Sequence, residues 1–274
     1  MPELPEVETV SRTLRQLVIG KTIAGVDVKW ANIIKRPDDV EQFKLELIGQ
    51  TIHEVNRRAK FLLFVLDDIT MVSHLRMEGR YGLFQKDEEL PPHTHVVFRF
   101  TDGSELRYQD VRKFGTMHLF KKGTEEQYMP LSQLGVEPFS ERFTAELLQE
   151  AFKKTTRTVK VVLLDQKTVV GLGNIYVDEA LFRAGILPNR LASSLTSDEL
   201  SLLHKEIVQT LQEAVDLGGS SVKSYVNGQG EMGMFQQQLK VYGRKGEACH
   251  QCGNEISKSV VGGRGTHFCV NCQK

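Results

Sequence analysis

Residues 249–272 read CHQCGNEISKSVVGGRGTHFCVNC and hold all four cysteines of the 274-residue chain, spaced C-x2-C-x16-C-x2-C. Two intervening residues let a tight turn direct both sulfurs of a pair at one ion. Two such pairs complete the tetrahedral thiolate cage that zinc prefers. Four thiolates leave no open coordination position, so we expect one structural zinc ion. The predicted metal ligands are Cys249, Cys252, Cys269 and Cys272.

Two disulfides are the alternative for these cysteines. The chain starts MPELPEVE, which has neither the basic nor the apolar part of a signal peptide. We therefore expect a cytoplasmic location, where disulfides are rare. His250 and His267 lie beside the cysteines and are predicted not to bind the metal, because four thiolates saturate it.

The segment between the two cysteine pairs has the pattern of a β-hairpin. Ile256–Val260 alternates as a strand does, glycines surround Arg264, and Thr266–Phe268 suits a returning strand. Arg264 would lie at the tip, where a guanidinium can bind phosphate through two parallel hydrogen bonds. The alternative is an ordinary surface arginine. Residues 236–274 carry six Lys or Arg against two Glu, which favours a polyanion, although the whole chain balances 35 bases against 35 acids.

The N-terminal half combines helix and strand patterns. A first helix places Val7, Val10, Leu14 and Leu17 on one face, and Gly20 ends it. Short apolar runs separated by turn residues then predict an antiparallel β-sandwich or barrel. The predicted strands are Thr22–Trp30, Thr51–Val55, Phe61–Leu66, Met71–Leu75, Val96–Phe100, Leu106–Tyr108 and Thr116–Phe120, and a second helix is predicted over Val40–Leu47.

The chain becomes helical after Pro130. Helices are predicted over Ala145–Lys153, Val159–Leu164, Ile175–Ala184 and Leu200–Leu217, the last preceded by Thr196 and Glu199 at capping-box spacing. Residues 218–235 are rich in glycine and are predicted to form a mobile loop.

These patterns together predict an α+β fold with three domains. They are an N-terminal β-sandwich domain with flanking helices (1–132), a helical domain (133–235) and a C-terminal β-hairpin zinc finger (236–274). The longest apolar runs, such as Phe61–Leu66, are too short to span a bilayer, so we expect no membrane partner.

Pro2 is a candidate nucleophile. If Met1 is removed, Pro2 becomes an N-terminal secondary amine, and an α-amino group titrates near ~8, well below lysine at ~10.4. Such an amine can attack an electrophilic carbon and form a cationic imine, with the neighbouring Glu3 moving protons. While Met1 is attached, the nitrogen is an amide and cannot attack. Many proteins begin Met-Pro without any such role.

Seven motifs along the chain resemble the bacterial formamidopyrimidine-DNA glycosylase family, which excises oxidised purines such as 8-oxoguanine. They are MPELPEVET, RRAKFLL, HLRMEGRYG, DVRKFG, GLGNIYVDEALFRAGILP, VYGRKGEACHQCG and GGRGTHFCVNCQ, in this order. The resemblance implies a helix–two-turns–helix element in the helical domain, and a single chain that acts on damaged duplex DNA as glycosylase and abasic-site lyase.

The resemblance also implies roles for single residues. Pro2 resembles the nucleophile, Glu3 the proton shuttle, Lys60 the lysine near the scissile phosphates, and Arg264 the phosphate-gripping arginine of the finger. Met77, Arg112 and Phe114 would fill the hole left by a flipped nucleotide. The further residues that resemble DNA-backbone contacts are His74, Asn174, Tyr242 and Lys258, and His93 resembles another DNA-binding position.

Each of these residues also has an ordinary interpretation. Taken alone, Met77 and Phe114 suit a core, His74 a buried and hydrogen-bonded histidine, Lys60 an edge-strand charge and Asn174 a helix cap. Two other functions remain open. The sister endonuclease VIII type shares the Pro-Glu start and the finger but prefers oxidised pyrimidines, and a non-catalytic DNA-binding module would share the helices and finger. The PELPEV start favours the purine enzyme.

Overall fold

A computed structural model describes residues 1–220 and 233–274. The predicted mobile loop 218–235 falls mostly outside these residues. The chain divides into two compact units, the first made of residues 1–2, 6–132 and 220–233 and the second of residues 3–5, 133–219 and 234–274. The predicted domain boundaries at 132/133 and 235/236 stay predictions.

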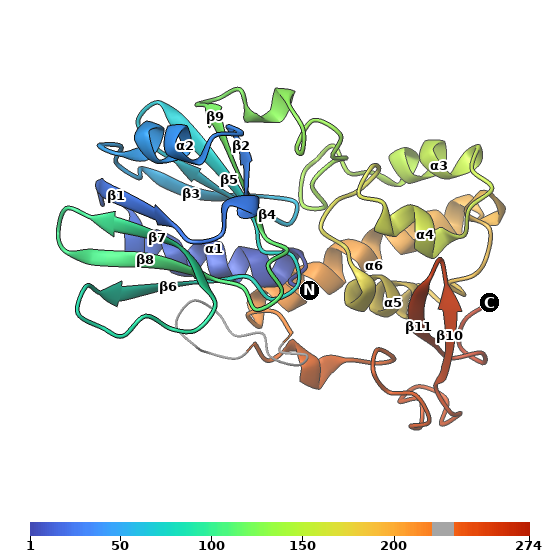
Figure 1. Cartoon of the computed structure of the whole chain (residues 1–274). Coiled ribbons are helices and arrows are strands. Elements are labelled where there is room, and N and C mark those ends of the chain that lie inside the picture. The colour runs from blue at the N-terminus through green and yellow to red at the C-terminus, as the bar shows by residue number, and fades with distance from the viewer. Residues whose placement is uncertain (221–232) are drawn as a thin grey trace. The chain divides into compact units, whose positions relative to one another are not determined.

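The first unit is a β-sandwich of two facing sheets (Figure 1). One sheet has the order β1 (Ile23–Val28), β7 (Thr94–Phe100), β8 (Ser104–Gln109) and β6 (Arg80–Gln85). The other has the order β2 (Ile34–Arg36), β9 (Thr116–Lys121), β5 (Ile69–His74), β4 (Phe61–Val65) and β3 (Glu54–Arg58). Neighbouring strands are antiparallel except β2 and β9, which are parallel. The predicted sandwich is therefore confirmed, with one parallel pair added.

Helix α1 (Leu4–Val18) contributes to the core between the sheets. Its apolar face buries Val7, Val10 and Leu14 as predicted, while Leu17 is only partly buried. These side chains join inward-facing residues of both sheets in one apolar cluster, because alternate strand residues point into the same layer. Helix α2 (Val40–Leu47) covers the predicted residues, and Asp39 caps it by accepting the N–H of Glu41. Two short 3-10 helices, η1 (Ala31–Ile33) and η2 (Glu125–Gln127), complete the unit.

Two strands of the sandwich were not predicted. β2 has only three residues, two of them charged and exposed, so it has no apolar alternation to detect. β6 contains Gly82, and its apolar residues Leu83 and Phe84 are both only half-buried, which weakens the period-two pattern.

The second unit is mainly helical. It contains α3 (Ala145–Lys153), α4 (Val159–Leu164), α5 (Asn174–Arg183), η3 (Ala192–Ser194), α6 (Ser197–Asp216) and η4 (Phe235–Gln238). α3 and α4 match the predicted bounds. α5 begins one residue before the predicted start, and α6 begins three residues before it. Thr196 and Glu199 form the predicted capping box at the start of α6.

The second unit ends in a hairpin of β10 (Ser257–Val261) and β11 (Arg264–Phe268), which lies beside α5 (Figure 1). Val261 pairs with Arg264, which leaves Gly262 and Gly263 as a two-residue turn. Both glycines have positive φ, 57° and 73°, the geometry that a tight hairpin turn requires. Arg264 follows the turn directly, so the predicted hairpin with the arginine at its tip is confirmed.

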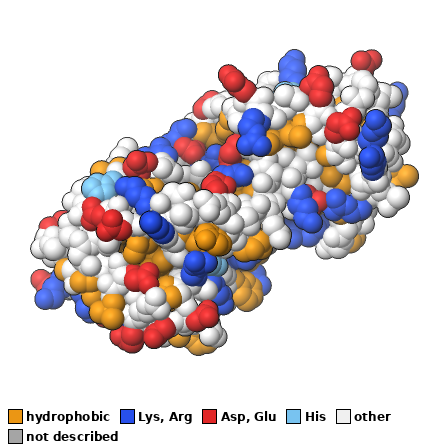
Figure 2. Space-filling view, turned by 90° about the horizontal axis from the view of Figure 1, so that it is seen from above, with side chains coloured by type: hydrophobic (Ala, Val, Ile, Leu, Met, Phe, Trp, Pro, Cys, Tyr) orange, Lys and Arg blue, Asp and Glu red, His pale blue; other side chains and the backbone are white. Residues whose placement is uncertain are grey.

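The surface is mixed in charge. On the face shown in Figure 2, acidic and basic side chains are interspersed, as expected of a chain with equal numbers of each. Among the described residues, no helix combines the length and the hydropathy needed to cross a membrane.

Candidate metal centre and nucleic-acid interface

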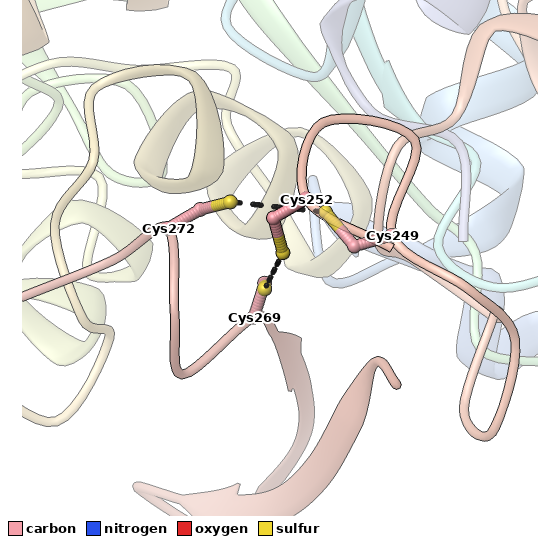
Figure 3. A group of neighbouring side chains, drawn as sticks. All are labelled: Cys249, Cys252, Cys269 and Cys272. Carbon is pink, nitrogen blue, oxygen red and sulfur yellow. Dashed lines mark hydrogen bonds between the residues drawn. The ribbon is translucent and has the colours of Figure 1, made fainter. Parts of the chain in front are cut away.

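The four cysteines converge as the sequence predicts (Figure 3). Cys249 and Cys252 come from one loop, and Cys269 and Cys272 follow β11. All four sulfurs lie within 4.8 Å of one another, with 3.5 Å between Cys252 and Cys269 and 3.8 Å between Cys249 and Cys272. Sulfurs that bind one zinc ion at about 2.3 Å in a tetrahedron are separated by about 3.8 Å. The donor set therefore fits one structural zinc, and the four thiols are not joined in disulfides.

Glu3 is held at the N-terminus of α5. Its carboxylate accepts the backbone N–H of Gly173 at 2.7 Å, of Ile175 at 3.0 Å and of Tyr176 at 3.4 Å. A Cβ on Gly173 would lie 2.3 Å from the Glu3 carboxyl carbon, so only glycine permits this approach. The positive end of the helix dipole favours an acid here. The result is a buried carboxylate of fixed orientation directly after Pro2, which is itself buried.

Asn174 does not cap α5. It is the first helical residue after the N-cap Gly173, and its side-chain amide donates to the carbonyl oxygen of Gly265 in β11 at 2.8 Å. The ordinary interpretation as a helix cap is therefore wrong. Asn174 instead lies against the finger, bonded to the residue next to Arg264, whose side chain is exposed and has no hydrogen bond or ion pair within the described part of the chain.

Two adjacent carboxylates on α5 hold the finger. Asp178 accepts the N–H of His267 at 2.8 Å and forms an ion pair with Lys160 of α4 at 2.6 Å. Glu179 accepts the N–H of Lys240, Val241 and Tyr242 at 2.8, 2.9 and 2.8 Å. Burial raises the pKa of Glu179, and these backbone bonds oppose the rise. The Tyr242 ring also packs edge-on against His267, with ring centroids 5.1 Å apart.

Lys60 and His74 are two buried side chains of the first unit. Lys60 lies in the two-residue turn between β3 and β4 and is buried, not an exposed edge-strand charge. His74 Nδ1 accepts the N–H of Arg76 at 2.8 Å, so the neutral ring carries its proton on Nε2. Burial lowers the pKa of His74 to about 3, helped by the positive charges of Arg76 and Lys60. The ring can therefore donate a hydrogen bond from Nε2 while it stays uncharged.

The loop that carries Arg112 and Phe114 is organised by Asp110. The buried Asp110 carboxylate accepts the N–H of Arg112 at 3.0 Å, of Phe114 at 2.9 Å and of Gly115 at 2.8 Å. The Arg112 guanidinium lies 4.9 Å from the centre of the Phe114 ring. Phe114 is 51% exposed and Met77 is 39% exposed, so neither is a core residue.

Tyr108 explains why two of the motifs contain glycine. A Cβ on Gly115 would lie 1.8 Å from the Tyr108 hydroxyl, and a Cβ on Gly79 would lie 2.2 Å from it. The buried Tyr108 ring thus packs against both the Met77 loop and the Phe114 loop. Two loops that are far apart in sequence are therefore held by one side chain, with exposed apolar residues beside each contact.

Left-handed backbone marks the same loops. Among the described residues of the first unit, the non-glycine residues with positive φ are Ala59, Arg76, His93 and Lys113, with φ between 54° and 62°. Each is, or directly precedes, a predicted site residue: Lys60, Met77, His93 itself and Phe114. Such conformations cost energy and gather at functional sites. His93 and Lys258 are both exposed, the latter on β10.

A cavity of the first unit is separate from these residues. It has a volume of about 740 Å³ and lies between α2, β2 and β9, and none of the predicted site residues lines it. Lys60, His74, Met77, His93, Arg112 and Phe114 belong with Pro2 to the first unit. Glu3, Asn174, Tyr242, Lys258, Arg264 and the cysteines belong to the second.

Five residues with clear roles were missed: Tyr108, Asp110, Lys160, Asp178 and Glu179. For the last two a signal existed, because α5 reads NIYVDEALFR and places two acids within an apolar run. A carboxylate in such a run must be paired when it is buried. Nothing local in the sequence identifies the partners.

Comparison with known proteins is consistent along the whole chain. Residues 1–117 match the Formamidopyrimidine-DNA glycosylase N-terminal domain, residues 134–226 the Formamidopyrimidine-DNA glycosylase H2TH domain, and residues 246–274 the Zinc finger found in FPG and IleRS. The protein named Formamidopyrimidine-DNA glycosylase of Cytobacillus firmus is 74% identical, and the match covers 100% of both chains. That of Bacillus subtilis is 63% identical over 100% of this chain and 99% of the relative.

Solved structures agree. A point mutant of the Lactococcus lactis FPG, in complex with a Fapy-dG containing DNA, is 43% identical and superposes with a TM-score of 0.94 over 100% of both chains. The Lactococcus lactis Fpg in complex with an abasic site containing DNA gives a TM-score of 0.93 at 43% identity over 99% of both chains. These matches extend over the sandwich, the helical unit and the four-cysteine finger, and the chain belongs to the formamidopyrimidine-DNA glycosylase family.

Proposed function

We propose that this DNA glycosylase and abasic-site lyase removes oxidised purines, including 8-oxoguanine and formamidopyrimidines, from duplex DNA with Pro2 as its nucleophile. The observation that carries the proposal is the buried Glu3 carboxylate, which is held by backbone N–H groups at the N-terminus of α5 and belongs to the residue directly after Pro2. A fixed acid beside a secondary amine is the arrangement that attack with proton transfer requires.

The reaction follows from the chemistry of the amine. Once Met1 is removed, the Pro2 nitrogen attacks the sugar C1′ and displaces the damaged base, which takes up a proton delivered through Glu3. The cationic imine at C1′ acidifies the C2′ hydrogen. Loss of that proton expels the 3′ phosphate, and a second elimination expels the 5′ phosphate. Water then releases the sugar fragment from Pro2.

Two groups of residues would hold the DNA. Lys60 and the uncharged His74 suit phosphates near the damaged sugar, because one supplies a charge and the other an Nε2–H donor. Asn174, Tyr242, Lys258 and Arg264 suit phosphates at the finger, and His93 adds an exposed contact in the first unit. The zinc would hold the finger and take no part in the chemistry.

Exposed apolar side chains support a role in nucleotide flipping. Met77 and Phe114 would enter the space left by the extruded nucleotide, and Arg112 would hydrogen-bond the orphaned cytosine. Exposed apolar side chains that gather at one place mark interaction sites, and Tyr108 packs against the loops of both Met77 and Phe114. Because the similar proteins come from bacteria, whose DNA lies in the cytoplasm, we place the enzyme there, acting as a single chain.

Borohydride trapping tests the proposal. The processed enzyme is mixed with duplex DNA that contains 8-oxoguanine opposite cytosine, and an adduct is expected that Pro2→Gly abolishes. Intact mass first establishes that Met1 is absent. If the processed wild type forms no adduct, Pro2 is not the nucleophile, and a non-catalytic DNA-binding module is favoured instead.

A parallel duplex with an oxidised pyrimidine separates the purine enzyme from the endonuclease VIII type. One solved Lactococcus lactis Fpg, 43% identical, is in complex with an oxidised pyrimidine containing DNA, so the comparison must be of rates. Faster excision of the pyrimidine would contradict the proposed preference.

A further inference from the structure

We propose that Thr266 and Asp178, bridged by Lys160, are positioning residues that set the place of Arg264 for phosphate binding. This inference rests on the proposed function, in which Arg264 contacts a DNA phosphate.

A continuous chain of hydrogen bonds links α5 to the backbone of Arg264. The Thr266 hydroxyl donates to the carbonyl oxygen of Arg264 at 2.8 Å and accepts from Lys160 Nζ at 2.8 Å. Lys160 Nζ donates in turn to Asp178 Oδ1 at 2.6 Å. The side chains of Thr266, Lys160 and Asp178 are fully buried. In a buried network each bond is directional and excludes water, so the arrangement of the backbone at Arg264 is tightly specified.

The strand and the helix match in register. Asn174 and Asp178 are four residues apart on α5, which corresponds to about 6 Å along the helix. They bond to Gly265 and His267, which are two residues apart on β11, or about 6.7 Å along a strand. The two bonds are both 2.8 Å long. β11 therefore lies along one face of α5, and Arg264 extends past Asn174 toward the N-terminal end of the helix, where anions bind favourably.

The zinc alone does not fix this end of the hairpin. The metal ligand Cys269 follows the last residue of β11, while Arg264 is its first residue, about 17 Å away along a strand. The turn before Arg264 is instead held by α4, because a Cβ on Gly262 would lie 2.4 Å from Val161 Cγ2. Metal binding and placement of Arg264 thus depend on different side chains.

Salt dependence of DNA binding measures the proposed role. Each phosphate contact contributes about 0.9 to the slope of log K against log salt concentration for duplex DNA. Arg264→Ala should lower the slope by about this amount for a duplex with a tetrahydrofuran abasic analogue. Thr266→Val keeps the shape of the side chain and removes the hydroxyl, so it should lower the slope similarly and weaken binding several-fold. Thr266→Ser should restore both.

Three further measurements separate positioning from a general structural role. Zinc content should stay at that of the wild type in Thr266→Val. The double variant Thr266→Val/Arg264→Ala should bind no more weakly than Arg264→Ala, because both changes remove the same contact. Asp178→Asn should resemble Thr266→Val, while Asp216→Asn, the same change at an exposed residue of α6, should match the wild type.

The outcomes distinguish the two proposals. If Arg264→Ala leaves the slope unchanged, Arg264 does not contact a phosphate as the proposed function states. The positioning role of Thr266 and Asp178 is then overturned too. If Arg264→Ala lowers the slope but Thr266→Val does not, only the positioning role is overturned. Loss of zinc from Thr266→Val, or additive effects in the double variant, would also overturn it. Because Thr266→Val removes no buried charge, it decides the question even if Asp178→Asn fails to fold.

Discussion

The Asp110 carboxylate accepts the backbone N–H of Phe114 at 2.9 Å, four residues further along the chain. The same carboxylate accepts two more N–H groups in this loop, so one buried side chain determines where Arg112 and Phe114 lie. The loop is exposed at its tip and fixed at its base.

Replacing Asp110 should therefore disorder the loop. Asp110→Ala leaves three N–H groups without their acceptor, at a cost of roughly 1–3 kcal/mol in the free energy of unfolding for each one that water cannot reach. We expect affinity for a damaged duplex to fall about tenfold or more, measured by fluorescence anisotropy beside urea unfolding. Asp110→Asn, which keeps one acceptor oxygen, should lie between. Asp87→Ala, at an exposed loop residue, is the control. Wild-type affinity in Asp110→Ala would contradict the assignment.

Gly115→Ala should be destabilising because of Tyr108. The new methyl group would overlap the Tyr108 hydroxyl, which lies 1.8 Å from the Cβ position, so either the ring or the loop must move. Overpacking of this kind costs about 1–3 kcal/mol. The matched control is Gly25→Ala in β1, where the nearest atom is an arginine terminus at 3.7 Å. Equal unfolding free energies for the two variants would show that Tyr108 does not constrain the loop.

His74 should make stability depend on pH. Its folded pKa of about 3 lies below the unfolded value near 6.5, so folding excludes a proton. The stability contribution is complete above pH 6.5 and is lost as pH falls toward 3, by up to about 1.4 kcal/mol per pH unit. Between pH 7 and pH 5, His74→Asn should therefore lose about 2 kcal/mol less than the wild type in urea unfolding. Asn can still accept the Arg76 N–H.

His118 is the comparison for this experiment. Burial lowers its pKa to about 4, so His118→Asn should flatten the curve between pH 7 and pH 5 by nearly the same amount, and the two variants should differ only below about pH 4. A His74→Asn curve parallel to that of the wild type would show that the histidine takes up its proton without unfolding.

Removing a zinc ligand should unfold the finger and spare the sandwich. The apolar cluster of the finger is small, with Val241 and Ile256 packed on Phe182 beside the cysteines, so metal binding must supply most of its stability. Cys269→Ser should lower zinc content, abolish lesion-specific binding and leave the unfolding transition of the sandwich in place. Val270→Ser, an exposed change between the same cysteines, should retain zinc. Intact lesion-specific binding without zinc would remove the finger from the DNA interface.

The elements that depend on local sequence signals were predicted well. α2, α3 and α4 begin and end at the predicted residues because each has an apolar face and two of them a side-chain cap. The cysteine spacing predicted a cluster that needs no distant partner. Strands with alternation, such as β9, were found as well, whereas three-residue β2 and glycine-containing β6 were not.

The sequence did not predict the features that depend on contacts between residues far apart in the chain. Nothing near Asp110 in the sequence says that its carboxylate is buried, and nothing near Glu3 says that residues 173–176 surround it. The positive φ of Ala59 and Lys113 could not be predicted from the sequence either, because the surrounding fold imposes this conformation on residues that do not prefer it. Family motifs named Lys60 and Arg264 without showing what holds them.

The match between α5 and β11 also limits how this finger can vary in evolution. Gly265 and His267 meet Asn174 and Asp178 in one register, and a shift of one residue would turn every side chain of the strand to its other face. Insertions and deletions should therefore be excluded between Arg264 and Cys269. The loop after Cys252 is constrained as well, because Gly253 has a positive φ of 79° and its N–H donates to the carbonyl oxygen of Cys249 at 2.9 Å.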